Sequence, residues 1–459
     1  MKMKNKTYPI FSVLLIGFIQ TGFGQWSTAS LSQARFAFTA ASENGKVLFA
    51  GGAINNLVST SRVDIYDVAT NKWSTLERSF AGAKPAAVAA GGKIYIAGGY
   101  DLPLGTESKA IDVYNTNTGL WETPLQLSVA RGSLSAVRVG NKLLFAGGVT
   151  INAFATQEQG ISVVDIYDLV SGTWTTHQLS VGRGWMSSIV KDQKAYFAGG
   201  LAYPNYFSKN IDIYDAVTNT WSVDSLSTAR AQSAAASNGD KIMFAGGWNN
   251  TSSALSSVDV LTSSGTRQTA SLSEARMGLT AQTICGKTYF MGGGTINLAD
   301  GIINSASKKV DIYDGVNNSW TTDNLTSNRS EMPSISIGNR LFVGGGYDPT
   351  AGLRSSVEIY MCTPTGLESI VDGNSVEIFP NPASSFLNVA FSETPIYSTL
   401  DALFVYDLMG RAWLQKKLVP ADLHQPILLD LNELPEGEYF LIIEAQEKYR
   451  LLRRFVVLR

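Results

Sequence analysis

Six arginines stand at matching positions along the chain, each fifteen or sixteen residues before a glycine pair. They are Arg35, Arg131, Arg183, Arg230, Arg276 and Arg329. One repeat departs, with Gly82 at the matching offset and Lys84 nearby. Guanidinium groups gathered around one opening could hold a carboxylate or a sulfate through paired hydrogen bonds. The alternative is a structural role, in which each arginine ties neighbouring repeats together through backbone carbonyl groups.

Aromatic residues gather in the loops that follow the glycine pairs. They are Tyr100, Phe154, Tyr203, Tyr206, Phe207, Trp248 and Tyr347. Polar side chains such as Asn205, Asn249 and Asp348 accompany them, and such a mixture suits stacking on sugar rings or holding a peptide. We therefore predict that Tyr100, Tyr203, Tyr206, Trp248 and Tyr347 bind a ligand together with the six arginines.

Other chemistry is scarce in the sequence. His177 and His424 are the only histidines, which excludes a multi-histidine metal site, and no nucleophile elbow or phosphate-binding loop occurs. We predict no catalytic residue, no metal and no cofactor. The formal net charge of −2 gives no basic surface for nucleic acid. The two cysteines, Cys285 and Cys362, leave open whether a disulfide forms.

A repeat positions these residues. Strand-like segments ending in a glycine pair place their first glycines at 51, 98, 147, 199, 246, 292 and 344. A second signature follows each pair, as in VDIYD at 63–67 and IDIYD at 211–215, and a tryptophan follows most of its tyrosines after seven residues. Alternation of apolar and polar residues predicts strands, so each repeat reads as four antiparallel strands.

The register also indicates how the array closes. The seventh repeat has Tyr360 but no tryptophan after it, whereas Trp26 precedes Arg35 by nine residues, as in complete repeats. We expect residues 25–28 to supply the missing outer strand and so remove an exposed edge. The fifth repeat has Leu261 and Arg267 in place of tyrosine and tryptophan, which predicts the weakest outer packing.

This combination of glycine pair, tyrosine and tryptophan resembles the kelch repeat family over residues 26 to about 361. The resemblance implies an all-β fold, a seven-bladed β-propeller. The arginines stand where the chain enters each innermost strand, and the aromatic loops follow the next strand. Both sets are therefore expected at one mouth of the central channel.

The two ends of the chain carry export signals. Lys2, Lys4 and Lys6 precede a short apolar run, which predicts a signal peptide over 1–24 and no membrane-spanning segment in the mature chain. The tail resembles the C-terminal sorting domain of type IX secretion substrates. The matching residues are Pro380, Asn381, Pro382, Asp407, Gly410, Gly437 and Tyr439. This resemblance implies a small β-sandwich that engages the type IX machinery of a Gram-negative bacterium.

The expected organisation is a signal peptide at 1–24, a propeller at 25–361, a linker at 362–374 and a sorting domain at 375–459. The predicted protein is secreted or held at the cell surface, and the sequence leaves release or attachment open. We expect a binding protein that recognises a glycan or a protein partner. The alternatives are a carbohydrate-active enzyme, such as a mutarotase of the sialic acid type, and a structural surface component.

Overall fold

The structure is a computed structural model that describes residues 25–55, 58–102, 104–152, 157–202, 206–262, 265–299, 301–362, 376–391, 400–407, 412–418, 426–445 and 449–459. Within these ranges the regular elements are all β-strands. No helix in them could cross a membrane. The predicted signal peptide lies outside the described residues, as does almost all of the predicted linker.

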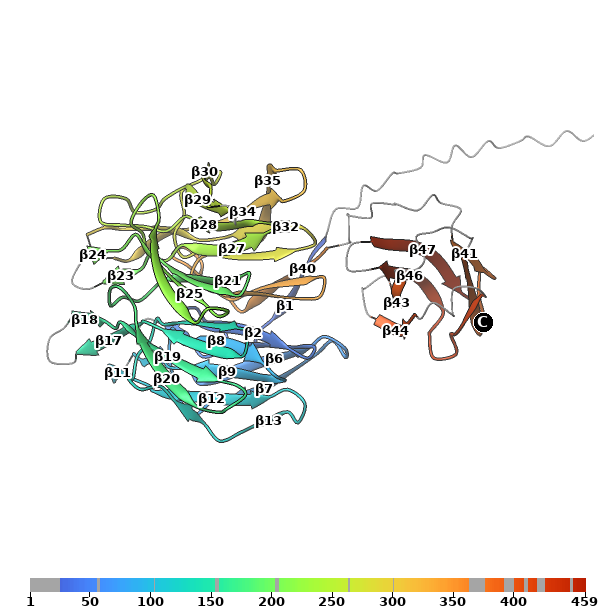
Figure 1. Ribbon diagram of the computed structural model, residues 1–459, viewed down its shortest axis with the longest axis horizontal. Coiled ribbons are helices and arrows are strands. Elements are labelled where there is room, and N and C mark those ends of the chain that lie inside the picture. The colour runs from blue at the N-terminus through green and yellow to red at the C-terminus, as the bar shows by residue number, and fades with distance from the viewer. Residues whose placement is uncertain are drawn as a thin grey trace, which may run out of the picture.

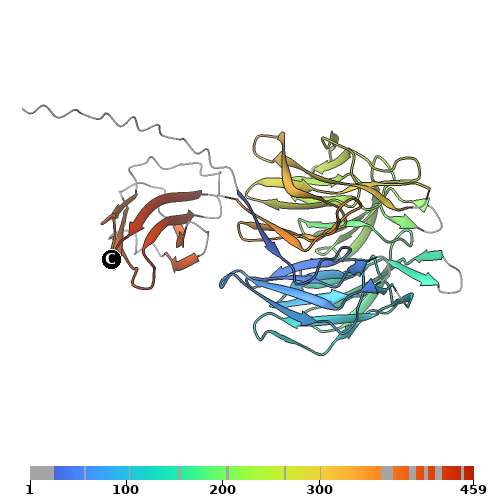
Figure 2. The same cartoon turned by 180° about the vertical axis from the view of Figure 1, so that it is seen from behind.

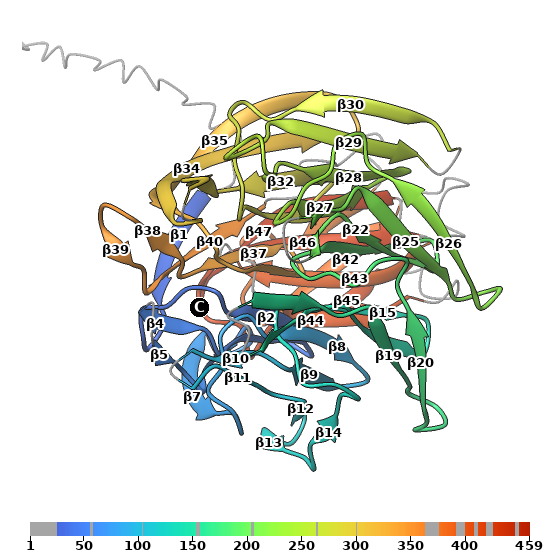
Figure 3. The same cartoon turned by 90° about the vertical axis from the view of Figure 1, so that its left-hand side faces the viewer.

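Counted over its described residues, the segment 25–362 forms seven sheets of one design, named here sheet 1 to sheet 7 in chain order. In Figure 3 the chain colour runs in order around the ring, from blue through green and yellow to orange. The innermost strands are β2 (Thr39–Glu43), β8 (Ala86–Ala90), β15 (Ser135–Val139), β21 (Ser187–Lys191), β27 (Ala234–Asn238), β31 (Thr280–Ile284) and β36 (Ser334–Ile337). Each contacts the next, and β36 contacts β2, so the ring is closed.

Three further strands complete each sheet outwards (Figure 1). The second strands, which end at the glycines, are β3 (Lys46–Ala50), β9 (Lys93–Ala97), β16 (Lys142–Ala146), β22 (Lys194–Ala198), β28 (Lys241–Ala245), β32 (Lys287–Met291) and β37 (Arg340–Gly344). The third strands are β6 (Arg62–Asp67), β12 (Ala110–Asn115), β19 (Val163–Asp168), β25 (Asn210–Asp215), β29 (Ser257–Thr262), β34 (Ile303–Asp314) and β40 (Ser356–Met361). The outer strands are β7 (Lys72–Glu77), β13 (Leu120–Trp121) with β14 (Leu125–Gln126), β20 (Trp174–Gln178), β26 (Thr220–Ser225), β30 (Arg267–Ser271), β35 (Ser319–Arg329) and β1 (Gln25–Ser30).

Short hairpins project between the second and third strands. They are β4 (Ala53–Asn55) with β5 (Val58–Ser59), β10 (Tyr100–Asp101) with β11 (Thr106–Glu107), β17 (Val149–Asn152) with β18 (Gln157–Gly160), β23 (Leu201–Ala202) with β24 (Tyr206–Phe207), and β38 (Tyr347–Asp348) with β39 (Gly352–Leu353). In sheet 6, β33 (Gly294–Ile296) pairs with the start of β34. These hairpins carry Tyr100, Tyr206, Phe207 and Tyr347, whereas Trp248 forms an isolated bridge with Ala231.

The expected closing strand is confirmed. β1 pairs antiparallel with β40, and Trp26 lies opposite Tyr360. Their ring centroids are 5.0 Å apart, and the tyrosine–tryptophan pairs of five other sheets span 4.9–5.5 Å. The N-terminal strand therefore completes sheet 7 with the same outer packing that continuous repeats achieve.

The glycine pairs turn the chain where the neighbouring sheet is too close for a side chain. Gly199 has a φ of 67°, and a Cβ there would lie 2.4 Å from the carbonyl oxygen of Arg230 in the next repeat. Its neighbour Gly200 donates its N–H to that same oxygen at 2.8 Å. Glycine is required for both reasons, conformation and close approach.

The C-terminal residues form two further sheets, drawn in red in Figure 2. One contains β41 (Val376–Phe379), β42 (Phe386–Phe391) and β45 (Ile427–Asp430), and the other contains β43 (Leu400–Asp407), β44 (Ala412–Lys417), β46 (Gly437–Ala445) and β47 (Tyr449–Val457). Buried residues of both sheets, including Val389 and Leu441, share one hydrophobic core. The tail is thus built from two sheets that cover each other's apolar faces.

A disulfide joins sheet 6 to sheet 7. Cys285, in the turn between β31 and β32, is bonded to Cys362, which follows β40, with Cα atoms 6.5 Å apart. The bridge holds the end of the strand on which β1 closes the ring. It therefore resolves the alternative that the sequence left open.

Replacing both cysteines by serine should lower the free energy of unfolding by about 2–4 kcal/mol, because the unfolded chain regains the freedom that the cross-link removes. Urea unfolding of the mature chain, oxidised and reduced, measures the effect. The reduced wild type should match the C285S/C362S variant. Equal midpoints for the oxidised wild type and the variant would contradict a stabilising bridge.

Candidate functional site

The predicted arginines lie inside the sheets, with side chains no more than 1% exposed. Each faces a carboxylate on the third strand of the sheet whose innermost strand follows it in the chain. The pairs are Arg35–Asp64 (2.7 Å), Arg131–Asp165 (2.7 Å), Arg183–Asp212 (2.6 Å), Arg230–Asp259 (2.9 Å), Arg276–Asp311 and Arg329–Glu358 (2.7 Å). Burial lowers the pKa of these guanidinium groups, and the facing carboxylates partly offset that change.

Sheet 2 has the same pair from a different sequence position. Arg78, four residues before Gly82, donates from Nε to Asp112 at 3.0 Å and from Nη2 to the carbonyl of Gly98 at 3.0 Å. Its side chain is as buried as those of the other arginines. Arg78 therefore takes the place of the arginine that the second repeat lacks at position 82. Lys84 is not needed for this ion pair.

These pairs hold the crossover from one sheet to the next. In sheet 4, for example, Asp212 also accepts the backbone N–H of Ser180 at 2.8 Å, and Arg183 reaches the carbonyls of Gly199 and Phe197. The guanidinium groups thus have no face open to a ligand, contrary to the ligand-binding role predicted for them, because their donors are turned into the sheets. The acid of each second signature was the sequence signal that could have revealed this.

A closed circle of hydrogen bonds surrounds the mouth of the channel instead. Its members stand two residues after each arginine position: Ala37, Lys84, Ser133, Trp185, Gln232, Gly278 and Glu331. All seven have a φ between 49° and 59°, and each donates its backbone N–H to the carbonyl of the member before it at 2.7–3.1 Å. We call these residues the mouth ring. They share a conformation and no residue type, so their spacing from the arginine positions is the one feature that marks them in the sequence.

The larger side chains of the mouth ring bond across the opening. Lys84 Nζ lies 3.4 Å from Glu331 Oε1, which also accepts from Gln232 Nε2 at 2.9 Å. The same ammonium lies 4.4 Å from the centroid of the Trp185 ring, and Trp185 Nε1 donates to Ser133 Oγ. The opening is therefore covered by one connected network of charge, amide, hydroxyl and indole.

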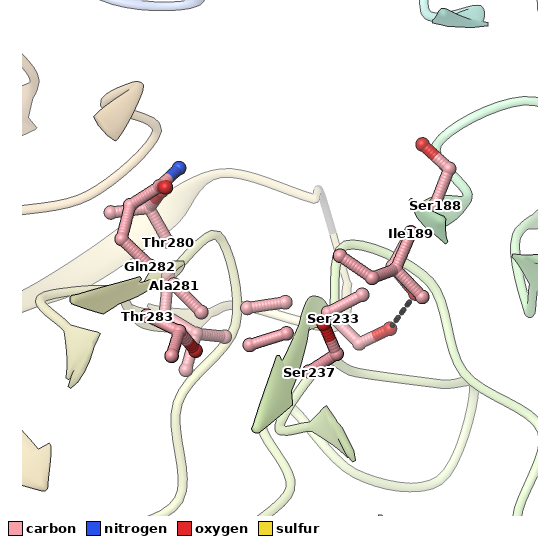
Figure 4. A pocket seen from close by; sticks show the side chains of 13 residues that line it. Ser188, Ile189, Ser233, Ser237, Thr280, Ala281, Gln282 and Thr283 are labelled. Carbon is pink, nitrogen blue, oxygen red and sulfur yellow. Dashed lines mark hydrogen bonds between the residues drawn. The ribbon is translucent and has the colours of Figure 1, made fainter. Parts of the chain in front are cut away.

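Below this network a cavity of about 460 Å³ follows the innermost strands of sheets 4 to 6. Figure 4 shows its small side chains, among them Ser233, Ser237, Thr280 and Thr283, with Gln282 as the longest polar one. Several are bonded to each other, as Ser187 Oγ is to Ser233 Oγ at 3.0 Å. The cavity is thus lined mostly by small residues, with hydroxyl groups beside the apolar Ile189 and Leu279.

The predicted aromatic residues divide into three groups. Tyr100 and Trp248 join the mouth network, through Ser133 Oγ and through Gln232 Oε1 at 3.1 Å respectively. Tyr206 is 57% exposed on β24, and Tyr347 packs on Phe36 with centroids 5.6 Å apart. Tyr203 lies outside the described residues, as do Phe154 and Asn205.

The sorting residues hold the tail together where the structure describes them. Asn381 Oδ1 accepts the N–H of Val456 at 3.0 Å, Asp407 accepts from Trp413 Nε1 at 2.9 Å, and Tyr439 donates to the carbonyl of Pro435 at 2.7 Å. Pro380 and Pro382 flank Asn381 after β41, and Gly437 begins β46. Gly410 lies outside the described ranges.

The histidines do not form a metal site in the part of the chain that the structure describes. His177 stacks on Trp221 with centroids 4.3 Å apart, and burial lowers its pKa. His424 lies outside that part. Among the described residues there is no group of three side chains that could hold a metal ion.

Comparison with known proteins agrees with both resemblances. Residues 377–458 match the secretion system C-terminal sorting domain, and residues 82–123 match the kelch motif. Similar curated proteins include the kelch repeat protein M-T8 of Myxoma virus (33% identical, covering 36% of this chain and 31% of that protein) and Kelch-like protein 36 of Bos taurus (28%, 41% and 31%). The chain thus spans about a third of their length. A solved structure titled "Structure of YjhT" is 17% identical, with a TM-score of 0.49, over 60% of this chain and 93% of that one.

The buried pairs make a direct prediction. Replacing Arg183 or Arg78 by methionine should each lower the free energy of unfolding by about 3–5 kcal/mol, because a buried carboxylate loses its counter-ion. Urea unfolding measures this, with the exposed Arg138→Met as a control that should stay within about 0.5 kcal/mol of wild type. If Arg78→Met behaved like Arg138→Met, Arg78 would not be the arginine of sheet 2.

Proposed function

We propose that this kelch-repeat chain with its type IX sorting domain is an exported binding protein, secreted or held at the surface of a Gram-negative bacterium. In this proposal residues 1–24 are a signal peptide, 25–361 a seven-bladed propeller, 362–374 a linker and 375–459 a β-sandwich that engages the secretion machinery. The closed ring of sheets and the two-sheet tail with its shared core support these assignments. The match to the sorting domain supports export.

The ligand site that we propose is the mouth ring, with a glycan as its ligand. The observation that carries this proposal is that the ring needs only backbone groups. Ala37 and Gly278 occupy the same conformation as Trp185, Gln232 and Glu331, so large side chains are not needed to close it. Their presence at the opening is best explained by contact with something that enters it.

The chemistry of these side chains suits a sugar. The Trp185 indole offers a flat apolar face for a pyranose ring, and Gln232, Ser133 and Lys84 offer donors and acceptors for hydroxyl groups. Trp248 and Tyr100 extend this surface through their bonds to Gln232 and Ser133. A protein partner is the competing ligand, and a structural component would bind neither.

A sugar-acid mutarotase remains the second candidate because an acid, Glu331, belongs to the mouth ring. Such an enzyme would need a carboxylate and an arginine that converge on substrate. The bonds of Glu331 run to Lys84 and Gln232, whereas the arginines predicted for the mouth face carboxylates inside their sheets. This arrangement favours binding over turnover.

A glycan array probed with the mature full-length protein tests the proposal. Trp185→Ala should weaken binding of any captured glycan at least tenfold, measured by calorimetry, because it removes the stacking face. The fold should persist, since Ala37 already adopts this conformation at φ 54°. Leu120→Ala, on a distant exposed hairpin, is the matched control and should bind as wild type.

Failure to capture any glycan, or unchanged binding by Trp185→Ala, would remove the proposed site. Capture of a protein partner that is sensitive to Trp185→Ala would keep the site and replace the ligand class. Faster exchange between sugar-acid anomers, lost in Glu331→Gln and followed by NMR, would decide for the enzyme.

A further inference from the structure

The outer packing between sheets follows one rule at several junctions of the ring. At these junctions a tryptophan lies near the residue three places after the tryptophan position of the sheet before it. Trp221 stacks on His177 in this way, and Trp320 shares a hydrophobic cluster with Ala270. Trp26 donates Nε1 to Asp323 Oδ2 at 3.0 Å. The position three residues after the tryptophan can therefore hold an apolar, aromatic or acidic residue. An acidic residue there accepts the N–H of the indole.

Sheet 5 breaks the rule because it has no tryptophan. Arg267 stands in that place, opposite Leu261 in the register of β29 and β30. Arg267 forms an ion pair with Asp224, the residue of sheet 4 that corresponds to Asp323, and donates to the carbonyl of Ser225 at 2.6 Å. Both side chains of the ion pair are about four-tenths exposed. A solvent-facing ion pair thus occupies the place of a packed indole.

Two hollows flank this ion pair between sheet 4 and sheet 5. The outer strands of these sheets, β26 and β30, are labelled in Figure 3. One, of about 200 Å³, is lined by Tyr196, Ile213, Ile242 and Leu261; the other, of about 440 Å³, continues along β30. Asp224 and Arg267 line both. Leu261 is buried at the position that a tyrosine holds in the complete repeats. The unfilled space therefore lies where a tryptophan would be.

The charges around the smaller hollow favour a ligand that donates hydrogen bonds. Three acids line it, Asp192, Asp224 and Asp240, against two cations, Lys191 and Arg267. Both cations are already paired, with Asp192 and Asp224 respectively. The smaller hollow therefore has one more carboxylate than cations, and it offers hydrogen-bond acceptors beside an apolar floor.

We propose that the smaller hollow, between sheets 4 and 5, is a docking site for a tryptophan side chain of a partner polypeptide. The indole covers Leu261 and Tyr196, and its N–H is donated to Asp224, as Trp26 donates to Asp323. Arg267 leaves Asp224 and lies over the indole face, a cation–π contact that guanidinium groups commonly make. The contact between Trp26 and Asp323 is the template for this complex. The site is independent of the mouth ring.

Titration of the mature protein with N-acetyl-5-fluorotryptophan amide, followed by ¹⁹F NMR, tests the proposal. Saturable binding in the millimolar range is expected for wild type. The double variant L261Y/R267W restores the residues of the complete repeats, so it should bind at least tenfold more weakly and unfold at a higher temperature. Trp185→Ala, which alters only the mouth ring, should bind the probe as wild type.

Asp224→Ala keeps the test decisive if the double variant does not fold. Its side chain is partly exposed, so the fold should persist, whereas loss of the acceptor should weaken probe binding several-fold. No saturable binding by wild type at about 10 mM probe, where millimolar affinity would be evident, would overturn the proposal. Equal affinity in wild type and both variants would overturn it as well.

Discussion

Each sheet of the ring receives the chain from its predecessor at a point where a buried guanidinium meets a buried carboxylate. The arginine enters from the crossover, the acid comes from the third strand, and both also bond to the backbone between them. Two charges removed from water are tolerated only when they are paired with each other and receive further hydrogen bonds. The same contact recurs in all seven sheets, at each point where the chain passes from one sheet to the next.

Much of the ring could be read from the sequence because steric and hydrophobic demands recur there at fixed spacing. The glycine pairs mark close backbone approach, and the tyrosine and tryptophan positions mark outer packing, so the repeats and the closing strand at Trp26 were predictable. Spacing does not tell which way a side chain points. The arginines were therefore placed correctly along the chain but were assigned to an opening that their side chains do not reach.

The mouth itself was harder to predict, because its seven positions share a backbone conformation and no residue type. A left-handed conformation at Trp185, Gln232 or Glu331 is uncommon outside glycine and asparagine, and only the closed circle of hydrogen bonds explains it. Arg78 was missed for a similar reason, because its side chain makes the same contact in sheet 2 from a different position in the sequence. Geometry that tolerates many side chains leaves little trace in one sequence.

The pairing of β1 with β40 has a consequence for how the protein matures. Strands separated by about 330 residues must meet before the ring is complete, which makes closure a late and slow event during folding. A chain that lacks its last repeat would leave β1 without a partner and would display open strand edges. Only a chain that includes its last repeat can therefore close the ring. The adjacent disulfide then fixes the closed ring covalently in an oxidising compartment.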